Sequence, residues 1–173
     1  MLVGLIVLQY VSNPRDMTWK KFSGEPIRQS IIDEVSLTIE REYASGNRLK
    51  VCVGTDSQVK GKQTDFATVI VFVREKKGGF MLIHQDRSAV KMTIKERMLA
   101  EVQRSIEVAY ALCPILDAHD VGLEVHADIN TSPMFKSNQA LHDAMGYILS
   151  MGFVFKAKPE AFASSACANK VVQ

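Results

Sequence analysis

The sequence of 173 residues lacks the cysteine patterns that mark several classes of protein. Its three cysteines, Cys52, Cys113 and Cys167, are too few and too far apart for a disulfide framework. None belongs to a Cys-x-x-Cys pair, so we expect no structural zinc site and interpret all three as reduced core residues. No cysteine has an activating neighbour in the sequence, which argues against a thiol enzyme.

The sequence also lacks a strong charge of either sign and a long apolar run. Its formal net charge is +2, so no overall basic field indicates nucleic acid, although a local basic patch stays open. The apolar segment 1–8 is too short to span a bilayer, and it has no basic residues before it or cleavage pattern after it. We therefore expect no membrane segment, no signal peptide and a cytoplasmic location.

What is present is the composition of an ordinary globular domain, with 47% hydrophobic and 23% charged residues. Apolar side chains at helical spacing predict a helix that begins near Pro26 and ends at Gly46-Asn47. We therefore divide the chain into an N-terminal extension with this helix, residues 1–48, and a main domain, residues 49–173. The segment 11–24 carries no pattern that can be assigned.

From residue 49 onward the hydrophobic period becomes that of strands. Five strands are predicted, the first three joined by turns into an antiparallel meander. Their ranges are 51–56, 64–73, 80–84, 122–128 and 153–156. A meander followed by alternating helices and strands predicts an α/β fold with a mixed five-stranded sheet and helices on its faces.

Three helices are predicted among these strands. A capping box in residues 93–96 begins the first of them, and we expect it to end near Leu112 because Pro114 follows. The second spans 137–151, and the last begins at Pro159. No internal repeat or low-complexity linker interrupts this order.

Three acidic residues stand in unusual positions. Asp56 and Asp128 each end a predicted apolar strand, and Glu101 lies in the apolar stripe of the helix that follows the capping box. Two like charges about 4 Å apart repel by about 4 kcal/mol at an effective dielectric near 20. A cluster of carboxylates must therefore take up protons or bind divalent cations, and oxygen ligands suit Mg²⁺ or Mn²⁺.

Each acid also has a structural interpretation when it is taken alone. A strand-end aspartate is often a turn former or a helix cap, which applies to Asp56 and Asp128. Glu101 can pair along its helix with Arg97 or Arg104. The coincidence of all three acids on this topology favours a shared site.

This topology and placement resemble the ribonuclease H-like superfamily, and more closely its YkuK-type family of largely uncharacterised bacterial proteins. The resemblance covers roughly residues 49–173. The segments that carry it are Val53-Gly54-Thr55-Asp56-Ser57-Gln58, Lys95-Glu96-Arg97-Met98-Leu99 with Glu101, Ser105-Ile106-Glu107-Val108-Ala109, His126-Ala127-Asp128-Ile129-Asn130 and Lys158-Pro159-Glu160-Ala161-Phe162-Ala163-Ser164-Ser165.

The resemblance implies that Asp56, Glu101 and Asp128 are catalytic acids that bind Mg²⁺ or Mn²⁺. It also implies a fourth acid near the start of the last helix, where this sequence offers Asn169 or, less well placed, Glu160. Asn169 shares the inward face of that helix but brings no charge. The chain departs from the family pattern at this position. An amide oxygen can still bind a metal ion, but it brings no negative charge to a second one.

The activity that the resemblance implies is phosphodiester hydrolysis in RNA, an RNA–DNA hybrid or structured DNA. Auxiliary candidates near the acids are His126, Asn130 and Ser57, although His126 is also interpretable as a core histidine. Basic residues could form an approach surface for phosphates or simply a solvated rim. These residues are Lys60, Lys62, Lys91, Lys95 and Arg97.

Two other functions compete with a nuclease. A binding module that kept the fold and lost the chemistry would account for Asn169 and the modest net charge. An actin-like ATPase shares the core topology but needs a second lobe and a Gly-rich loop that this domain lacks. The oligomeric state is not determined by the sequence.

Overall fold

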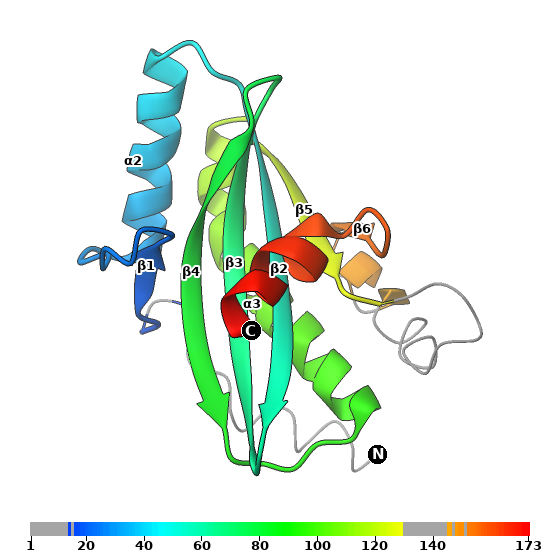
Figure 1. Cartoon of the computed structure of the whole chain (residues 1–173). Helices are drawn as coiled ribbons and strands as arrows, with labels where there is room; N and C mark the ends of the chain where they lie inside the picture. Colours follow the sequence, from blue (N-terminus) through cyan, green and yellow to red (C-terminus); the bar gives the residue numbers. More distant parts are fainter. Residues whose placement is uncertain (1–13, 15, 130–144, 147, 151) are drawn as a thin grey trace.

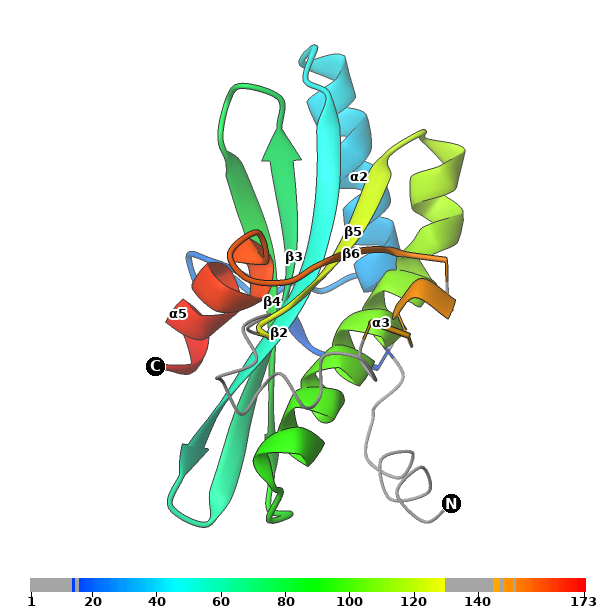
Figure 2. The ribbon, with the colours of Figure 1, turned by 90° about the vertical axis from the view of Figure 1, so that its right-hand side faces the viewer.

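The computed structural model describes residues 14, 16–129, 145–146, 148–150 and 152–173, and every structural statement below concerns these residues. They form a six-stranded mixed sheet with helices on both faces (Figure 1). Helices α2 (Ile31–Ala44) and α3 (Ile94–Ala118) lie on one face, and the C-terminal helical segment crosses the other (Figures 1 and 2).

The sheet has the strand order β1-β4-β3-β2-β5-β6. Strand β2 pairs with β5 and β5 with β6 in parallel, and the remaining pairs are antiparallel. The strands are β1 (Trp19–Lys21), β2 (Leu49–Lys60), β3 (Gln63–Arg74), β4 (Gly79–Ser88), β5 (Gly122–Ala127) and β6 (Val154–Lys156). The C-terminal segment consists of the π-helix η1 (Ala163–Ala168) and α5 (Asn169–Val172).

The mixed sheet with helices on its faces is as predicted, but its strand count is not. The sixth strand is β1, which lies in the segment that had no assignable pattern and pairs with β4 at the edge of the sheet. Three residues are too few to show a period of two, so periodicity misses such a strand. Strands β2 and β3 also run further than predicted, because their pairing continues to the register Lys60↔Gln63 at the turn.

Two helices have ends that differ from the prediction. Helix α2 begins at Ile31, where the Ser30 side chain accepts the Asp33 N–H and caps the helix. Helix α3 has the predicted capping box of Thr93 and Glu96, but it continues past Pro114 to Ala118. Proline removes one helical hydrogen bond, and the continued burial of Leu116 against the core stabilises the extra turn.

The C-terminal third of the chain departs from the predicted helices. The last helical segment begins at Ala163 and not at Pro159, because residues 158–160 form a turn first. The predicted helix 137–151 lies largely outside the described residues, and of its described positions 145–146 and 148–150 are helical.

Apolar side chains fill both faces of the sheet. The larger cluster lies between the sheet and helices α2 and α3, and it includes Val35 and Ile39 of α2. The smaller cluster joins Cys52 to Ala163 and Ala168 under the C-terminal segment. All three cysteines are free, but only Cys52 is a buried core residue as predicted, whereas Cys113 and Cys167 are half-buried.

The division of the chain at residues 48 and 49 stays a prediction, although α2 shares the larger core with the sheet. In the part of the chain that the structure describes, no helix is both long and apolar enough to cross a membrane.

Because side chains alternate along β2, successive residues face the helical segments on opposite faces of the sheet. Cys52, Gly54 and Asp56 face the C-terminal segment, whereas Thr55 and Ser57 face α3. The backbone of η1 packs so closely on Gly54 that an added Cβ would lie 2.5 Å from the Ser164 nitrogen. A strand residue without a side chain is therefore required where the C-terminal segment crosses β2.

Candidate functional site

The two aspartates follow the same point of the parallel β2–β5 pairing. The last paired residues are Thr55 and Ala127, so Asp56 of β2 and Asp128, directly after β5, come next at the same level of the sheet. Asp56 does not end its strand as predicted, because β2 continues to Lys60 with β3 as its partner. Since β5 ends here, no described strand covers the other edge of β2 from Asp56 onward, and side chains approach it there from both faces.

Asp56 is 6% exposed and points toward the C-terminal segment. The Asn169 amide Nδ2 donates to Asp56 Oδ2 at 2.7 Å, and the Ser57 backbone N–H donates to Oδ1 at 2.9 Å. Burial raises the pKa of Asp56, the negative charge of Asp128 raises it further, and these two hydrogen bonds oppose the rise. Asp56 is thus a buried acid whose charge is only partly compensated.

Glu101 approaches the same edge from α3 on the opposite face of β2. It is 5% exposed, and the Ser57 hydroxyl donates to its Oε1 at 2.5 Å. Burial raises the pKa of Glu101 to about 8, with the charges of Asp56 and Asp128 adding to the rise. The helical spacing correctly predicts that Glu101 turns inward.

Arg97 connects the Glu101 side of the site to β2. Its Nη1 donates to the Ser57 carbonyl at 2.9 Å and to the Ser57 hydroxyl at 3.0 Å, and lies 3.8 Å from Glu101 Oε1. The sequence left open whether Glu101 pairs with Arg97 along the helix or faces inward. In the structure Glu101 does both. This guanidinium turns toward the acids, whereas Lys60, Lys62 and the two other predicted phosphate contacts, Lys91 and Lys95, are exposed.

Asp128 has a partner that the sequence analysis did not single out. The Lys158 ammonium lies 2.7 Å from Asp128 Oδ1. This oxygen is buried and makes no hydrogen bond of good geometry within the described residues, so the contact is an attraction of charges. The one sequence signal that pointed to Lys158 is that it is the first residue of the last segment that carries the family resemblance. Asn130, the neighbouring auxiliary candidate, lies outside the described residues.

The C-terminal segment places Asn169, and not Glu160, against the acids. Asn169 contacts Asp56 as described, while Glu160 forms a surface ion pair with Lys156 at 2.9 Å. The position where the resemblance implies a fourth acid is therefore occupied by an amide. An amide donates to the neighbouring carboxylate instead of repelling it.

The three acids interact through charge more than through direct contact. In the described part of the chain, Asp56, Glu101 and Asp128 do not form a group of ligand oxygens that all lie within 4.8 Å of one another. Their chemistry nevertheless fits Mg²⁺ or Mn²⁺, because all three offer hard oxygen ligands. The raised pKa of Glu101 shows how much an ionised carboxylate at this position needs a nearby positive charge.

A second group, Cys52, Glu124 and His126, does lie within 4.8 Å but is better explained as a hydrogen-bond network. The Ala163 N–H donates to His126 Nδ1 at 3.1 Å, which leaves the proton of the neutral ring on Nε2, 3.1 Å from Glu124 Oε2. A metal-binding histidine instead donates from its second nitrogen. Burial also raises the pKa of the Cys52 thiol to about 12.

His126 is accordingly a core histidine, the second of the two interpretations that the sequence left open. Burial lowers its pKa, although the Glu124 carboxylate opposes this, and its ring packs edge-on against Phe162 with 4.8 Å between centroids. Its hydrogen bond to Ala163 ties the beginning of η1 to β5. His126 thereby helps to hold the C-terminal segment across the sheet.

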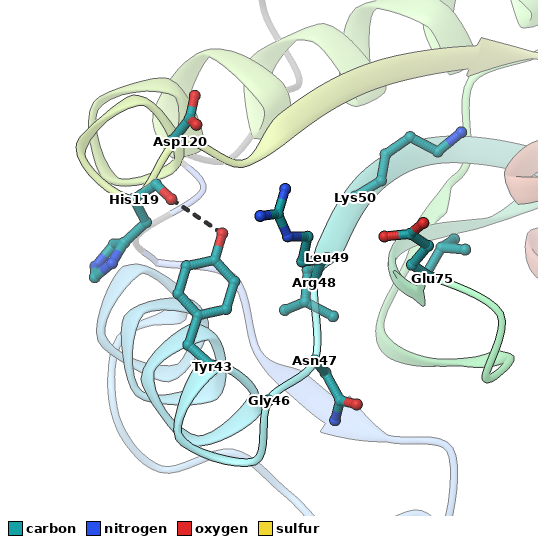
Figure 3. A pocket seen from close by; sticks show the side chains of 10 residues that line it. Tyr43, Gly46, Asn47, Arg48, Leu49, Lys50, Glu75, His119 and Asp120 are labelled. Carbon is teal, nitrogen blue, oxygen red and sulfur yellow. Dashed lines mark hydrogen bonds between the residues drawn. The ribbon is translucent and has the colours of Figure 1, made fainter.

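A hollow of about 840 Å³ is lined by none of the three acids. It lies near the start of β2, where Tyr43 donates to the His119 carbonyl at 3.0 Å along one wall and Arg48 extends into the space (Figure 3). Its walls also carry Glu75 and Asp120, so positive and negative groups are mixed there. None of its lining residues belongs to the acidic site.

Comparisons with known proteins agree with this topology. The model of the family described as "Ribonuclease H-like" matches residues 30–173. The chain is also 27% identical over 160 residues to "Uncharacterized protein YkuK" of Bacillus subtilis (strain 168), an alignment that covers 82% of this chain and 88% of that protein. No solved structure gives a significant match.

Proposed function

This chain belongs to the ribonuclease H-like family, of the YkuK type, and we propose that it is a divalent-metal-dependent nuclease that hydrolyses phosphodiester bonds. The observation that carries the proposal is Glu101, a carboxylate buried within a helix face whose pKa is raised to about 8 by burial and by two further acids. Strongly perturbed carboxylates with specific charged neighbours are typical of functional sites.

Each site residue has a role that its contacts support. Asp56, Glu101 and Asp128 would hold Mg²⁺ or Mn²⁺, which when bound activates water and stabilises charge on the phosphoryl group. Ser57 and Arg97 hold Glu101 in place from the β2 side. Asn169 orients Asp56 by donating to one of its oxygens.

The proposed substrate is RNA, an RNA–DNA hybrid or structured DNA. The β2–β3 turn, with Lys60 and Lys62, lies at the same end of the molecule as the start of α3, near Lys91 and Lys95 (Figures 1 and 2). Lys60 forms an ion pair with Asp65, with 3.4 Å between Nζ and Oδ2. Exposed ammonium groups of this kind contact phosphates irrespective of sequence, so binding should weaken steeply as salt is raised.

The test is Mn²⁺ binding by calorimetry together with cleavage of labelled RNA, hybrid and branched DNA. We expect the variants Asp56→Asn and Glu101→Gln to lose metal binding and at least about 100-fold of the cleavage rate, since a catalytic ion is worth several kcal/mol. Glu107→Gln is the matched control, because Glu107 lies on the same helix and bonds to Gln103 instead of the site. Negligible metal binding in wild type would exclude the proposal.

A second candidate function is a nucleic-acid- or protein-binding module without cleavage. The observation that favours it is that Asn169 and Lys158 already partner Asp56 and Asp128 without any added cation. Such a module would bind nucleic acid or protein equally well in EDTA and leave nucleic acid intact. Metal-dependent cleavage that is abolished by Asp128→Ala would exclude this alternative.

A further inference from the structure

We propose that the Lys158 ammonium is a permanent cation of the acidic site, which takes the place of a second divalent ion and limits the site to one. This inference rests on the proposed function, because it assumes that Asp56, Glu101 and Asp128 bind a metal ion. Lys158 is a charge-compensating residue in this account, and it acts through Asp128.

A backbone hydrogen bond holds Lys158 beside the end of β5. Its own N–H donates to the Ile129 carbonyl at 3.2 Å, which ties the residue to the chain directly after Asp128. Its side chain then reaches Asp128 Oδ1 at 2.7 Å while remaining 41% exposed. The ammonium therefore contacts a buried carboxylate oxygen while its side chain stays partly open to solvent.

The same C-terminal segment supplies a neutral group where the family pattern implies an acid. Asn169 donates to Asp56 Oδ2 at 2.7 Å, and its own Oδ1 accepts from Gln173 Nε2 at 2.6 Å. Each aspartate thus has one partner from the segment that follows β6. One partner is a full positive charge, and the other is an amide dipole.

Formal charges show what this arrangement accommodates. Three ionised carboxylates against Arg97 and Lys158 leave one net negative charge, so one divalent ion brings the site to one positive charge and two ions to three. With an acid at position 169 and a neutral side chain at 158, two divalent ions would instead give one positive charge. Relative to an acid at position 169 and a neutral side chain at 158, Asn169 and Lys158 together raise the charge of the site by two, which equals one divalent ion. A second divalent ion would therefore meet uncompensated repulsion.

The test is the number of Mn²⁺ ions bound by the full chain, measured by calorimetry at saturating Mn²⁺. We expect one ion in wild type, in Lys158→Arg, which keeps the charge, and in the control Lys156→Gln, which removes a neighbouring surface pair. The double variant Lys158→Gln with Asn169→Asp should bind two. Lys158→Gln alone should bind its ion about two- to fivefold more tightly, because a competing cation has left Asp128.

The outcomes separate the inference from the function on which it rests. Two ions in wild type would overturn the inference and leave the nuclease proposal standing, as would one ion in a double variant that circular dichroism shows to be folded. If the double variant does not fold, an unchanged Mn²⁺ affinity in folded Lys158→Gln overturns it in the same way. No ion in folded wild type would remove the proposed function itself.

Discussion

Glu101 is a residue whose environment, including the nearby Arg97, favours its protonated form up to about pH 8 when no metal ion is bound. Water cannot solvate its charge, and Asp56 and Asp128 repel it, while Ser57 and Arg97 offset only part of this. A bound divalent ion would reverse the balance by favouring the ionised form. At the scale of single residues, protons and the metal ion of the proposed function would therefore compete for the same carboxylates.

The pH dependence of stability follows from this competition. Native Glu101 holds its proton more tightly than the unfolded chain does, so its contribution to the free energy of unfolding of the metal-free protein should fall as the pH rises from about 4.5 toward 8. The slope for this one group reaches about 1.4 kcal/mol per pH unit, and Asp56 acts in the same direction. His126, whose pKa is lowered by burial, acts in the opposite direction as the pH rises toward 6.5. Urea unfolding in EDTA at several pH values measures this slope of the free energy of unfolding.

The variants Glu101→Gln and Glu107→Gln provide the comparison. The first should remove most of this slope, because glutamine does not titrate. The second should leave most of it in place, since Glu107 is only half-buried and bonds to Gln103. Equal pH dependence of stability between pH 5 and 8 in metal-free wild type and in Glu101→Gln would contradict the assigned environment of Glu101.

At the scale of the elements, the C-terminal segment assembles the site across the sheet. It runs over β2 at Gly54, is tied to β5 by the bond from Ala163 to His126, and delivers Asn169 to Asp56. Helix α3 delivers Glu101 from the opposite face. The two layers on opposite faces of the sheet therefore supply side chains to the same edge of β2, beyond the end of β5.

The close approach at Gly54 leads to a prediction about this segment. In Gly54→Ala the new methyl group would meet the backbone of Ala163 and Ser164, so η1 must shift away from β2. We expect a loss of about 1–3 kcal/mol in the free energy of unfolding, the usual cost of overpacking, and weaker Mn²⁺ binding because Asn169 moves with the segment. Denaturant unfolding and calorimetry measure the two effects.

Gly122→Ala is the matched control for this substitution. Gly122 lies on the neighbouring strand β5, and an added Cβ there has only the Lys50 Cγ, at 4.0 Å, as a neighbour within that distance. Its stability and metal affinity should stay close to wild type. Equal losses in the two alanine variants would mean that the effect at Gly54 is a general one of alanine in the sheet.

The element predictions succeeded where local sequence decides and failed where packing does. The capping box of Thr93 and Glu96 places the start of α3 correctly, because both hydrogen bonds are made within one turn. The predicted end before Pro114 is wrong, because burial of Leu116 outweighs the bond that proline removes. Strand β1 escaped notice because its pairing with β4 connects residues more than sixty positions apart.

At the scale of the whole molecule, the N-terminal strand and helix belong to the same apolar core as the rest of the sheet. Trp19 of β1, Val35 of α2 and Val53 of β2 all lie in the larger cluster. Trp19 is the only tryptophan of the chain and is 3% exposed. The chain therefore carries a single natural reporter of the N-terminal part of its core.

This core predicts one cooperative unfolding transition for the entire chain. The fluorescence of Trp19 and the far-ultraviolet circular dichroism of the helices and sheet should give coincident urea curves, because loss of β1 and α2 opens the core that the other strands share. Leu149→Ala, at an exposed side chain, is expected to leave both curves unchanged. Two separate transitions would instead support independent units on either side of residues 48 and 49.

By itself the sequence predicted a mixed sheet with helices on its faces and the inward direction of Glu101, and it singled out three acids as candidates, because these inferences depend on residue type and on spacing within single elements. Only the tertiary structure decided that Asp56 lies inside a strand, that Glu101 comes from the opposite face, and that Lys158 partners Asp128. The reason is physical: contacts between distant segments follow from strand register and layer packing, which no local pattern encodes. The charge compensation at the acids is a contact of this kind.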